Sequence, residues 1–139
     1  MKNYVVDTNV ISESIKPNPN SAAISWLESN SKSLYLTSIT IEELRFGALM
    51  MPKGKKRKAL EGWIDSLSQT FSRKILSFDT QAAEECAKFH EKAISSGRTP
   101  TIEDLMIAAV AKCNDCIVVS RNVKDFEYLD IEVVNPFDA

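Results

Sequence analysis

Apolar residues along the chain fall into short strand-like runs, separated by longer segments with helical spacing. The runs are rich in β-branched and aromatic residues, which favour strands. They lie at Tyr4 to Val6, Leu34 to Thr37, Ile75 to Phe78, Ile117 to Ser120 and Ile131 to Val134. The segments between them repeat apolar residues every three or four positions, as amphipathic helices do. These segments centre on residues 22–27, 41–49, 60–71, 82–93 and 105–111.

This alternation predicts an α/β fold. Strands that alternate with helices form a parallel or mostly parallel sheet that helices cover on both faces. We therefore expect a three-layer α/β/α sandwich around a central, mostly parallel sheet of about five strands. With 139 residues, the chain is expected to form a single domain over residues 1–139.

Acidic residues stand where several of the predicted strands end. Asp7 directly follows the first strand, and Asp125 comes shortly after the fourth. Glu43 lies early in the helix after the second strand, and Asp104 opens the most apolar helix. Ligands of open α/β sheets gather beyond the carboxyl ends of the strands. These carboxylates are therefore the candidate functional residues.

Each of these carboxylates has an alternative role at the start of a helix. Thr40 to Glu43 and Thr101 to Asp104 both match the pattern of a capping threonine with an acidic residue three positions later. Asp7 or Thr8 could equally cap the helix that follows the first strand. Capping requires no agreement between separate helices, whereas a divalent-cation site requires several carboxylates at one edge of the sheet.

If the carboxylates meet at one edge of the sheet, the site that they form would favour magnesium or manganese. Packed carboxylates repel one another and take up protons unless a cation neutralises them. Oxygen ligands without histidine or thiolate select a hard dication over zinc. Neighbouring polar side chains would hold the carboxylates or bound waters in position, or else act as ordinary turn and cap residues. The candidates are Thr8, Asn9, Ser120 and Asn122.

The net charge of −2 gives no general attraction to nucleic acid or membranes. No apolar stretch approaches the roughly 20 residues of a membrane span, and the N-terminus lacks a signal-peptide pattern, so we expect a cytoplasmic protein.

Basic residues gather locally in Pro52 to Lys58, a candidate contact for a phosphate backbone or else a solvated turn. Arg98 and Arg121 are further candidates for phosphate binding or for surface ion pairs.

The cysteines do not suggest a disulfide framework or a metal site. Cys86, Cys113 and Cys116 are odd in number and lie in apolar surroundings, so we expect them to be reduced. Cys113 and Cys116 form a C-x-x-C pair, but a second pair is missing and the single histidine, His90, is distant in sequence. We therefore do not expect a structural zinc ion.

Five blocks in order along the chain read VVDTNVISE, TSITIEELRFGA, EDLMIAA, VVSRNVKDFE and VVNP. In these blocks the chain resembles the PIN-domain family, and within it the VapC and FitB toxins of bacterial type II toxin–antitoxin pairs. The resemblance implies metal-binding, catalytic carboxylates at Asp7, Glu43 and Asp104. Some relatives place the fourth acidic residue where Asn122 stands and others where Asp125 stands. We expect Asp125 to be this member, with Asn122 as an alternative neutral ligand.

The resemblance also implies an activity and partners. It implies an endoribonuclease toxin, dependent on Mg²⁺ or Mn²⁺, that hydrolyses RNA phosphodiester bonds with a metal-activated water. It implies a cognate antitoxin, a homodimer able to enter a higher toxin–antitoxin assembly, and DNA contact only through the antitoxin. Apolar side chains on the helices are candidates for these contacts, with core packing as the alternative. They are Trp26, Phe46, Leu49, Met50 and Trp63.

Two other interpretations stay open at this point. A haloacid-dehalogenase-like phosphohydrolase would use Asp7 as a covalent nucleophile, but it requires an aspartate where this chain has Asn9. A catalytically silent PIN-like binding module would keep the carboxylates without cleaving RNA. Metal-dependent RNA cleavage that Asp7→Asn abolishes would separate the nuclease from both alternatives.

Overall fold

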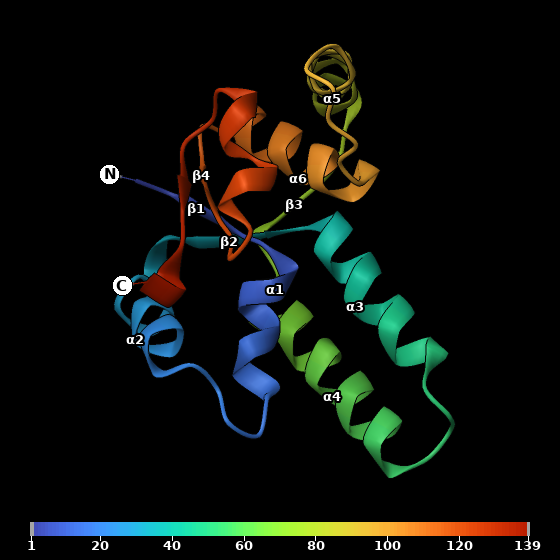
Figure 1. The fold of residues 1–139 in the computed structure, drawn as a ribbon. Helices are drawn as coiled ribbons and strands as arrows, with labels where there is room; N and C mark the ends of the chain where they lie inside the picture. Colours follow the sequence, from blue (N-terminus) through green and yellow to red (C-terminus); the bar gives the residue numbers. More distant parts are fainter. Residues whose placement is uncertain (1, 139) are drawn as a thin grey trace.

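A parallel sheet of five strands forms the centre of the computed structural model, which describes residues 2–138. The strand order is β3-β2-β1-β4-β5, and every neighbouring pair is parallel. The strands are β1 (Tyr4–Val6), β2 (Leu34–Thr37), β3 (Ile75–Leu76), β4 (Ile117–Val119) and β5 (Val133–Val134). The predicted α/β fold with a parallel central sheet is confirmed (Figure 1).

Helices connect the strands. The α-helices are α1 (Thr8–Ile11), α2 (Ser21–Ser29), α3 (Ser38–Met50), α4 (Lys55–Thr70), α5 (Thr80–Ser95) and α6 (Ile102–Cys113). Short 3-10 helices complete the chain: η1 (Ser12–Ile15), η2 (Ser31–Ser33), η3 (Val123–Asp125), η4 (Glu127–Leu129) and η5 (Pro136–Asp138). All the helices that the apolar spacing predicts are present, whereas α1 and the 3-10 helices were not predicted.

The two faces of the sheet pack against different helices. Val5 and Val118 point to one face, where they join a core with α5 and α6. Val6 and Val119 point to the other face and join a second core with α1, α2, α3 and α4. Successive strand residues alternate between faces, so this separation follows from the pleat. The predicted three-layer sandwich is therefore confirmed (Figure 1).

Some element boundaries differ from the prediction for local reasons. The last strand starts at Val133 rather than Ile131, and the residue before Ile131, Asp130, adopts the left-handed conformation with φ of 60°, which turns the chain ahead of the strand. Helix α3 starts at Ser38, because the Thr37 hydroxyl accepts the Thr40 backbone N–H at 3.2 Å. The predicted cap at Thr40 is therefore wrong. The predicted cap at Thr101 is confirmed, since its hydroxyl accepts the Asp104 backbone N–H at 3.2 Å.

The apolar candidates for partner contacts divide into two groups. Trp26 and Trp63 are half-buried and pack against the second core, where the Trp26 and Tyr4 rings meet edge to face with centroids 4.9 Å apart. On α3, Phe46, Leu49 and Met50 are 57%, 52% and 70% exposed. Core packing thus explains the two tryptophans, and the α3 residues remain available to a partner.

Two further expectations concern the described chain as a whole. Within residues 2–138, no helix combines the length and the apolar character needed to cross a membrane. Cys86, Cys113 and Cys116 are all free thiols, as predicted.

Candidate active site

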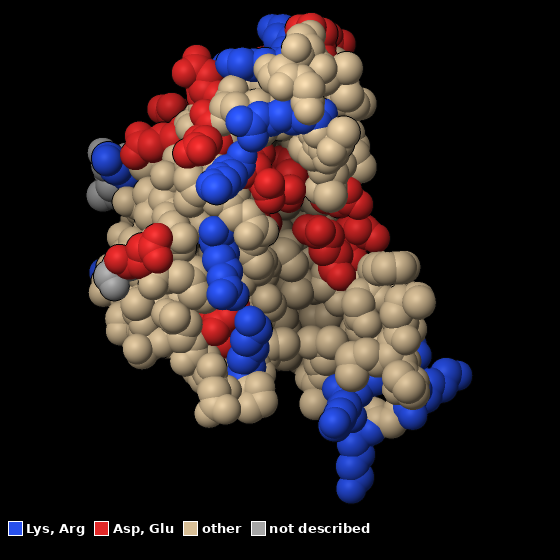
Figure 2. All heavy atoms as spheres, viewed as in Figure 1, with Lys and Arg blue, Asp and Glu red and all other residues tan. Residues whose placement is uncertain are grey.

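Parallel pairing brings the carboxyl ends of β2, β1 and β4 to one edge of the sheet. Val5 pairs with Tyr35 on one side and with Val118 on the other. Just beyond the edge, the Asp7 backbone N–H donates to the Val119 carbonyl at 2.8 Å. Figure 2 shows acidic side chains gathered in a hollow of the surface in this region.

Asp7 ends β1 and begins α1. Its side chain is only 5% exposed. Its Oδ1 accepts the Thr8 backbone N–H at 2.8 Å, so Asp7 caps α1. Its Oδ2 accepts the Ser120 hydroxyl at 2.8 Å and the Asn9 side-chain amide at 3.3 Å. The capping role and a role in a site are therefore compatible, because these bonds fix the orientation of the carboxylate.

Ser120 connects the ends of β1 and β4. While its hydroxyl donates to Asp7, its oxygen accepts the Asn122 backbone N–H at 3.0 Å. Asn9 adds to this connection, because its Oδ1 accepts the Arg121 backbone N–H at 3.2 Å. Asn122 takes part through its backbone, and within residues 2–138 its side chain makes no hydrogen bond.

Glu43 lies in the second turn of α3 and therefore does not cap the helix. The Thr8 hydroxyl donates to Glu43 Oε1 at 2.7 Å, and Thr8 Oγ1 lies 3.0 Å from Thr40 Oγ1. Thr8 thus holds Glu43 with its side chain and Asp7 with its backbone. The buried Thr40 was not among the sequence candidates, since its position suggested only a cap.

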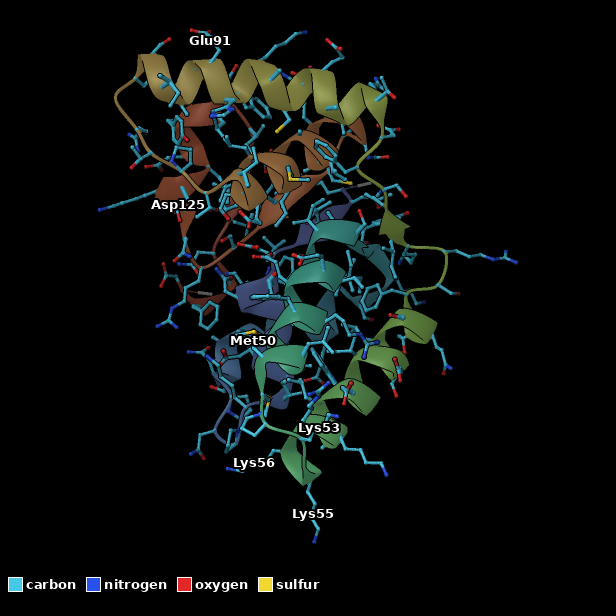
Figure 3. All side chains as sticks on the ribbon, turned by 90° about the vertical axis from the view of Figure 1, so that its right-hand side faces the viewer. Met50, Lys53, Lys55, Lys56, Glu91 and Asp125 are labelled. Carbon is cyan, nitrogen blue, oxygen red and sulfur yellow. The ribbon has the colours of Figure 1, made fainter. Side chains whose placement is uncertain are left out.

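Asp104 and Asp125 come from the opposite side of the hollow. Asp104 stands in the first turn of α6, which the Thr101 hydroxyl caps. Asp125 is the last residue of η3, and Figure 3 labels it. Both carboxylates are half-buried.

The pKa values show that these carboxylates influence one another. The pKa of Asp104 rises from 3.8 to about 6, first through burial and then through the charges of Asp7, Asp125 and Glu43, against a hydrogen bond with Thr101. Burial raises the pKa of Asp7, the bonds from Ser120 and Thr8 lower it, and the charge of Asp125 raises it. Four segments of the chain therefore place like charges within electrostatic reach of each other.

Two neighbouring glutamates extend the acidic surface. The pKa of Glu43 is raised first by burial, against the Thr8 hydrogen bond, and then by the charges of Asp7, Glu103 and Glu42. Glu42 directly precedes Glu43, and Glu103 directly precedes Asp104. Glu42 and Glu103 also line one pocket of about 370 Å³ between α3 and α6.

The donor chemistry fits a hard dication. Burial raises the pKa values of Asp7, Glu43 and Asp104, and none of them takes part in the ion pairs found within residues 2–138. Oxygen donors of this kind suit Mg²⁺ or Mn²⁺. Among residues 2–138, no group of three or more His, Cys, Asp or Glu side chains is arranged to hold a metal ion directly. Mg²⁺ usually keeps several waters and binds through one or two carboxylates, so direct contact with every carboxylate is not required.

Comparisons with known proteins identify the family of the chain. The model of the PIN domain family matches residues 4–132. The chain is 36% identical to the toxin FitB of Neisseria gonorrhoeae over 135 residues, covering 96% of this chain and 97% of that protein. It is 34% identical to VapC ribonuclease Y4jK of Sinorhizobium fredii over 136 residues, covering 96% and 97%.

A solved structure is also similar. The structure of FitAcB from Neisseria gonorrhoeae superposes with a TM-score of 0.91 at 35% identity, covering 98% of this chain and 99% of that one. Sequence and fold thus agree over nearly the whole length. The chain belongs to the PIN-domain family, in the group that includes the VapC and FitB toxins.

Proposed function

We propose that this protein is a divalent-metal-dependent endoribonuclease and the toxin of a toxin–antitoxin pair. The observation that carries the proposal is the gathering of Asp7, Glu43, Asp104 and Asp125 in one acidic hollow, close enough that Asp125 raises the pKa of Asp7 and Asp104, and Asp7 raises the pKa of Glu43 and Asp104. The ribonuclease name of the Sinorhizobium relative and the toxin name of the Neisseria relative support it. Such an enzyme would act on RNA in the cytoplasm.

The four carboxylates would hold Mg²⁺ or Mn²⁺. When bound, the ion would supply positive charge beside the phosphate and lower the pKa of a water molecule. Ser120 and the Thr8 backbone fix both oxygens of Asp7, and the Thr8 hydroxyl fixes Glu43. This pre-organisation keeps the carboxylates in place before the substrate arrives.

Asp125 is our choice for the fourth acidic ligand. Its charge acts on both Asp7 and Asp104, whereas Asn122 contributes a backbone N–H to Ser120. The chain has a single histidine, His90, which lies on α5. A ribonuclease mechanism that uses paired histidines is therefore not available.

An antitoxin partner and a homodimer belong to the same proposal. The exposed Phe46, Leu49 and Met50 on α3 are the candidate contact for one of them. Sedimentation of the purified protein, alone and together with the product of a neighbouring short reading frame, tests both associations.

Purified protein incubated with transfer, ribosomal and messenger RNA tests the activity. We expect cleavage at mapped positions with Mg²⁺ or Mn²⁺, no cleavage after chelation, and no cleavage by Asp7→Asn. Absence of cleavage from all RNA classes, with tight partner binding that Asp7→Asn leaves unchanged, would favour a silent binding module. Phosphate trapped covalently on Asp7 would favour the phosphohydrolase.

A further inference from the structure

Three basic side chains beside the acidic hollow have no carboxylate partner. Arg98 lies in the loop between α5 and α6, Arg121 follows β4, and Lys124 lies in η3; all are exposed. None of the three takes part in the ion pairs found within residues 2–138. Figure 2 shows lysine and arginine atoms in a column along one rim of the acidic hollow. Cationic side chains outside any ion pair thus border the acidic hollow.

Arg98 and Lys124 line a small pocket next to the site. The pocket has a volume of about 270 Å³. Its lining residues are Gly97, Arg98, Thr99, Pro100, Lys124, Asp125 and Tyr128. Because Asp125 is also one of the candidate site carboxylates, this pocket adjoins the acidic hollow.

Tyr128 holds Arg98 in position at this pocket. The Arg98 guanidinium stacks over the Tyr128 ring at 4.3 Å from the centroid, and one of its nitrogens lies 3.5 Å from the Lys124 carbonyl. Burial raises the pKa of Tyr128, Arg98 lowers it, and Asp125 and Asp104 raise it. The ring is therefore close to both the cation and the carboxylates.

Arg121 continues the basic rim on the other side of η3. Its backbone N–H donates to Asn9, so the site fixes its main chain. Its guanidinium stacks over the Phe137 ring at 4.9 Å from the centroid. The charge of Arg121 also helps to lower the pKa of Glu13, next to Lys16, after the larger effects of hydrogen bonds from Asn20 and Lys16. The positive rim thus extends from the pocket toward η1.

Stacked arginines suit the recognition of phosphate. A guanidinium offers a planar fork of N–H donors that matches phosphate oxygens, and stacking on an aromatic ring limits the entropy lost on binding. By contrast, Figure 3 places Lys53, Lys55 and Lys56 at the far end of α3 and α4, away from Asp125. They do not stack on any described aromatic ring. The lysine-rich turn is thus the less suitable of the two basic regions for guiding a substrate.

We propose that Arg98, Lys124 and Arg121 form a phosphate track that positions a single RNA strand across the acidic hollow, with the pocket beside Asp125 taking a phosphate next to the one that is cut. The inference rests on the proposed nuclease function and adds the path of the substrate. The three residues position the RNA and take no part in the chemistry.

The test compares two variants that each remove three positive charges. The track variant carries Arg98→Gln, Arg121→Gln and Lys124→Gln, and the control variant carries Lys53→Gln, Lys55→Gln and Lys56→Gln. Binding of a fluorescein-labelled, mixed-sequence single-stranded RNA is measured by anisotropy in an Asp104→Asn background with Mg²⁺, over a series of salt concentrations. Cleavage kinetics are measured in the wild-type background.

We expect the track variant to bind RNA about 10- to 100-fold more weakly than its parent. The slope of log affinity against log salt concentration should become smaller by about 2, because each of the three lost phosphate contacts contributes about 0.7. Its KM should rise while kcat changes little, and the lysine-turn variant should match its parent. A variant with Arg98→Lys, Arg121→Lys and Lys124→Gln keeps two of the three charges and should recover most of the salt slope. A purely structural role for these residues would not change the salt slope.

Three outcomes would overturn the track. In the first, the track variant keeps the KM and salt slope of its parent. In the second, the lysine-turn variant loses as much affinity as the track variant. In the third, the Asp104→Asn parent binds no RNA at low salt. If the wild-type protein cuts RNA and the track variant keeps the parental KM and salt slope, only the phosphate track is contradicted. If the wild-type protein cuts no RNA, the proposed nuclease function is contradicted.

Discussion

The acidic hollow and the lysine-rich turn are both clusters of like charge, but they differ in how the fold treats them. In the hollow, carboxylates from four segments are buried or half-buried, and burial together with neighbouring negative charge raises the pKa values of Asp7, Glu43 and Asp104. In the turn, Lys53, Lys55 and Lys56 follow one another closely along the chain and are exposed. Water screens the exposed second cluster more than the first. A bound cation would therefore stabilise the hollow more than an anion would stabilise the turn, which is why we propose the hollow as the functional cluster.

Removing one charge from the hollow should have the largest effect. Asp104→Asn keeps the shape of the side chain and the Thr101 cap, because that cap uses the Asp104 backbone N–H. We expect metal-dependent RNA cleavage to fall by about 100- to 1000-fold, which is the usual effect of losing a charge-stabilising group. Single-turnover cleavage measures this loss. The matched control is Glu91→Gln on the outer side of α5 (Figure 3), which should cleave normally; an equal loss in both variants would contradict the assignment.

The metal-free protein should lose stability as the pH rises. A folded-state pKa of about 6 for Asp104, against 3.8 ordinarily, means that the folded state holds the extra proton in this interval. The free energy of unfolding therefore falls between about pH 4 and pH 6, by on the order of 2 kcal/mol. Glu13 and Glu85 have lowered pKa values, so their contribution to the free energy of unfolding is lost only as the pH falls below 4.5, the ordinary pKa of a glutamate.

Urea unfolding near pH 5 and near pH 7 in a chelator measures this pH effect. Added Mg²⁺ should restore stability at the higher pH, and Asp104→Asn should make the metal-free profile less steep, leaving the contributions of Asp7 and Glu43, whose pKa values are also raised. The prediction fails if the metal-free wild type is equally stable at both pH values, or if Mg²⁺ has no effect on it.

Loosening the support of the carboxylates should have a smaller effect. Ser120→Ala removes the hydroxyl bond to Asp7, and Thr8→Val removes the bond to Glu43 while keeping the backbone cap. Losses of such supporting bonds typically reduce metal affinity or activity by about 10- to 100-fold. Metal titrations followed by cleavage rate would show a weaker apparent affinity for Mn²⁺. Unchanged titration curves would exclude a supporting role.

The smallest effect is expected at the lysine-rich turn. Exposed, unpaired side chains contribute little, so Lys53→Gln, Lys55→Gln and Lys56→Gln together should change stability by less than about 1 kcal/mol. Cleavage rates should also match the wild type. A large loss of either quantity would show that the turn is more than a solvated segment.

The sequence predicted the layers of the fold and the strands β1 and β2 to the residue. It did not predict α1, because a single helical turn is too short to show periodicity. It placed the cap of α3 at Thr40, since the local pattern there resembles a helix start more closely than Thr37 does. Helix propensity alone does not decide whether Thr37 or Thr40 caps the helix.

The candidate carboxylates were identifiable from the strand ends, but their surroundings were not. The bond from Thr8 to Glu43 joins residues 35 positions apart, and that from Ser120 to Asp7 joins residues 113 apart. Such pairs depend on the strand order, which short-range patterns do not contain. The stacking of Arg98 on Tyr128 has the same origin, since both lie in loops that meet only through packing.

The double duty of Asp7 has a practical consequence for anyone who needs an inactive form of this protein. Since Asp7 both caps α1 and accepts bonds from Ser120 and Asn9, an alanine there would damage folding together with activity, and a poorly expressed protein would be mistaken for an inactivated one. Asp104 is anchored through its main chain, so Asp104→Asn is the better choice for overproducing an intact, inactive reagent.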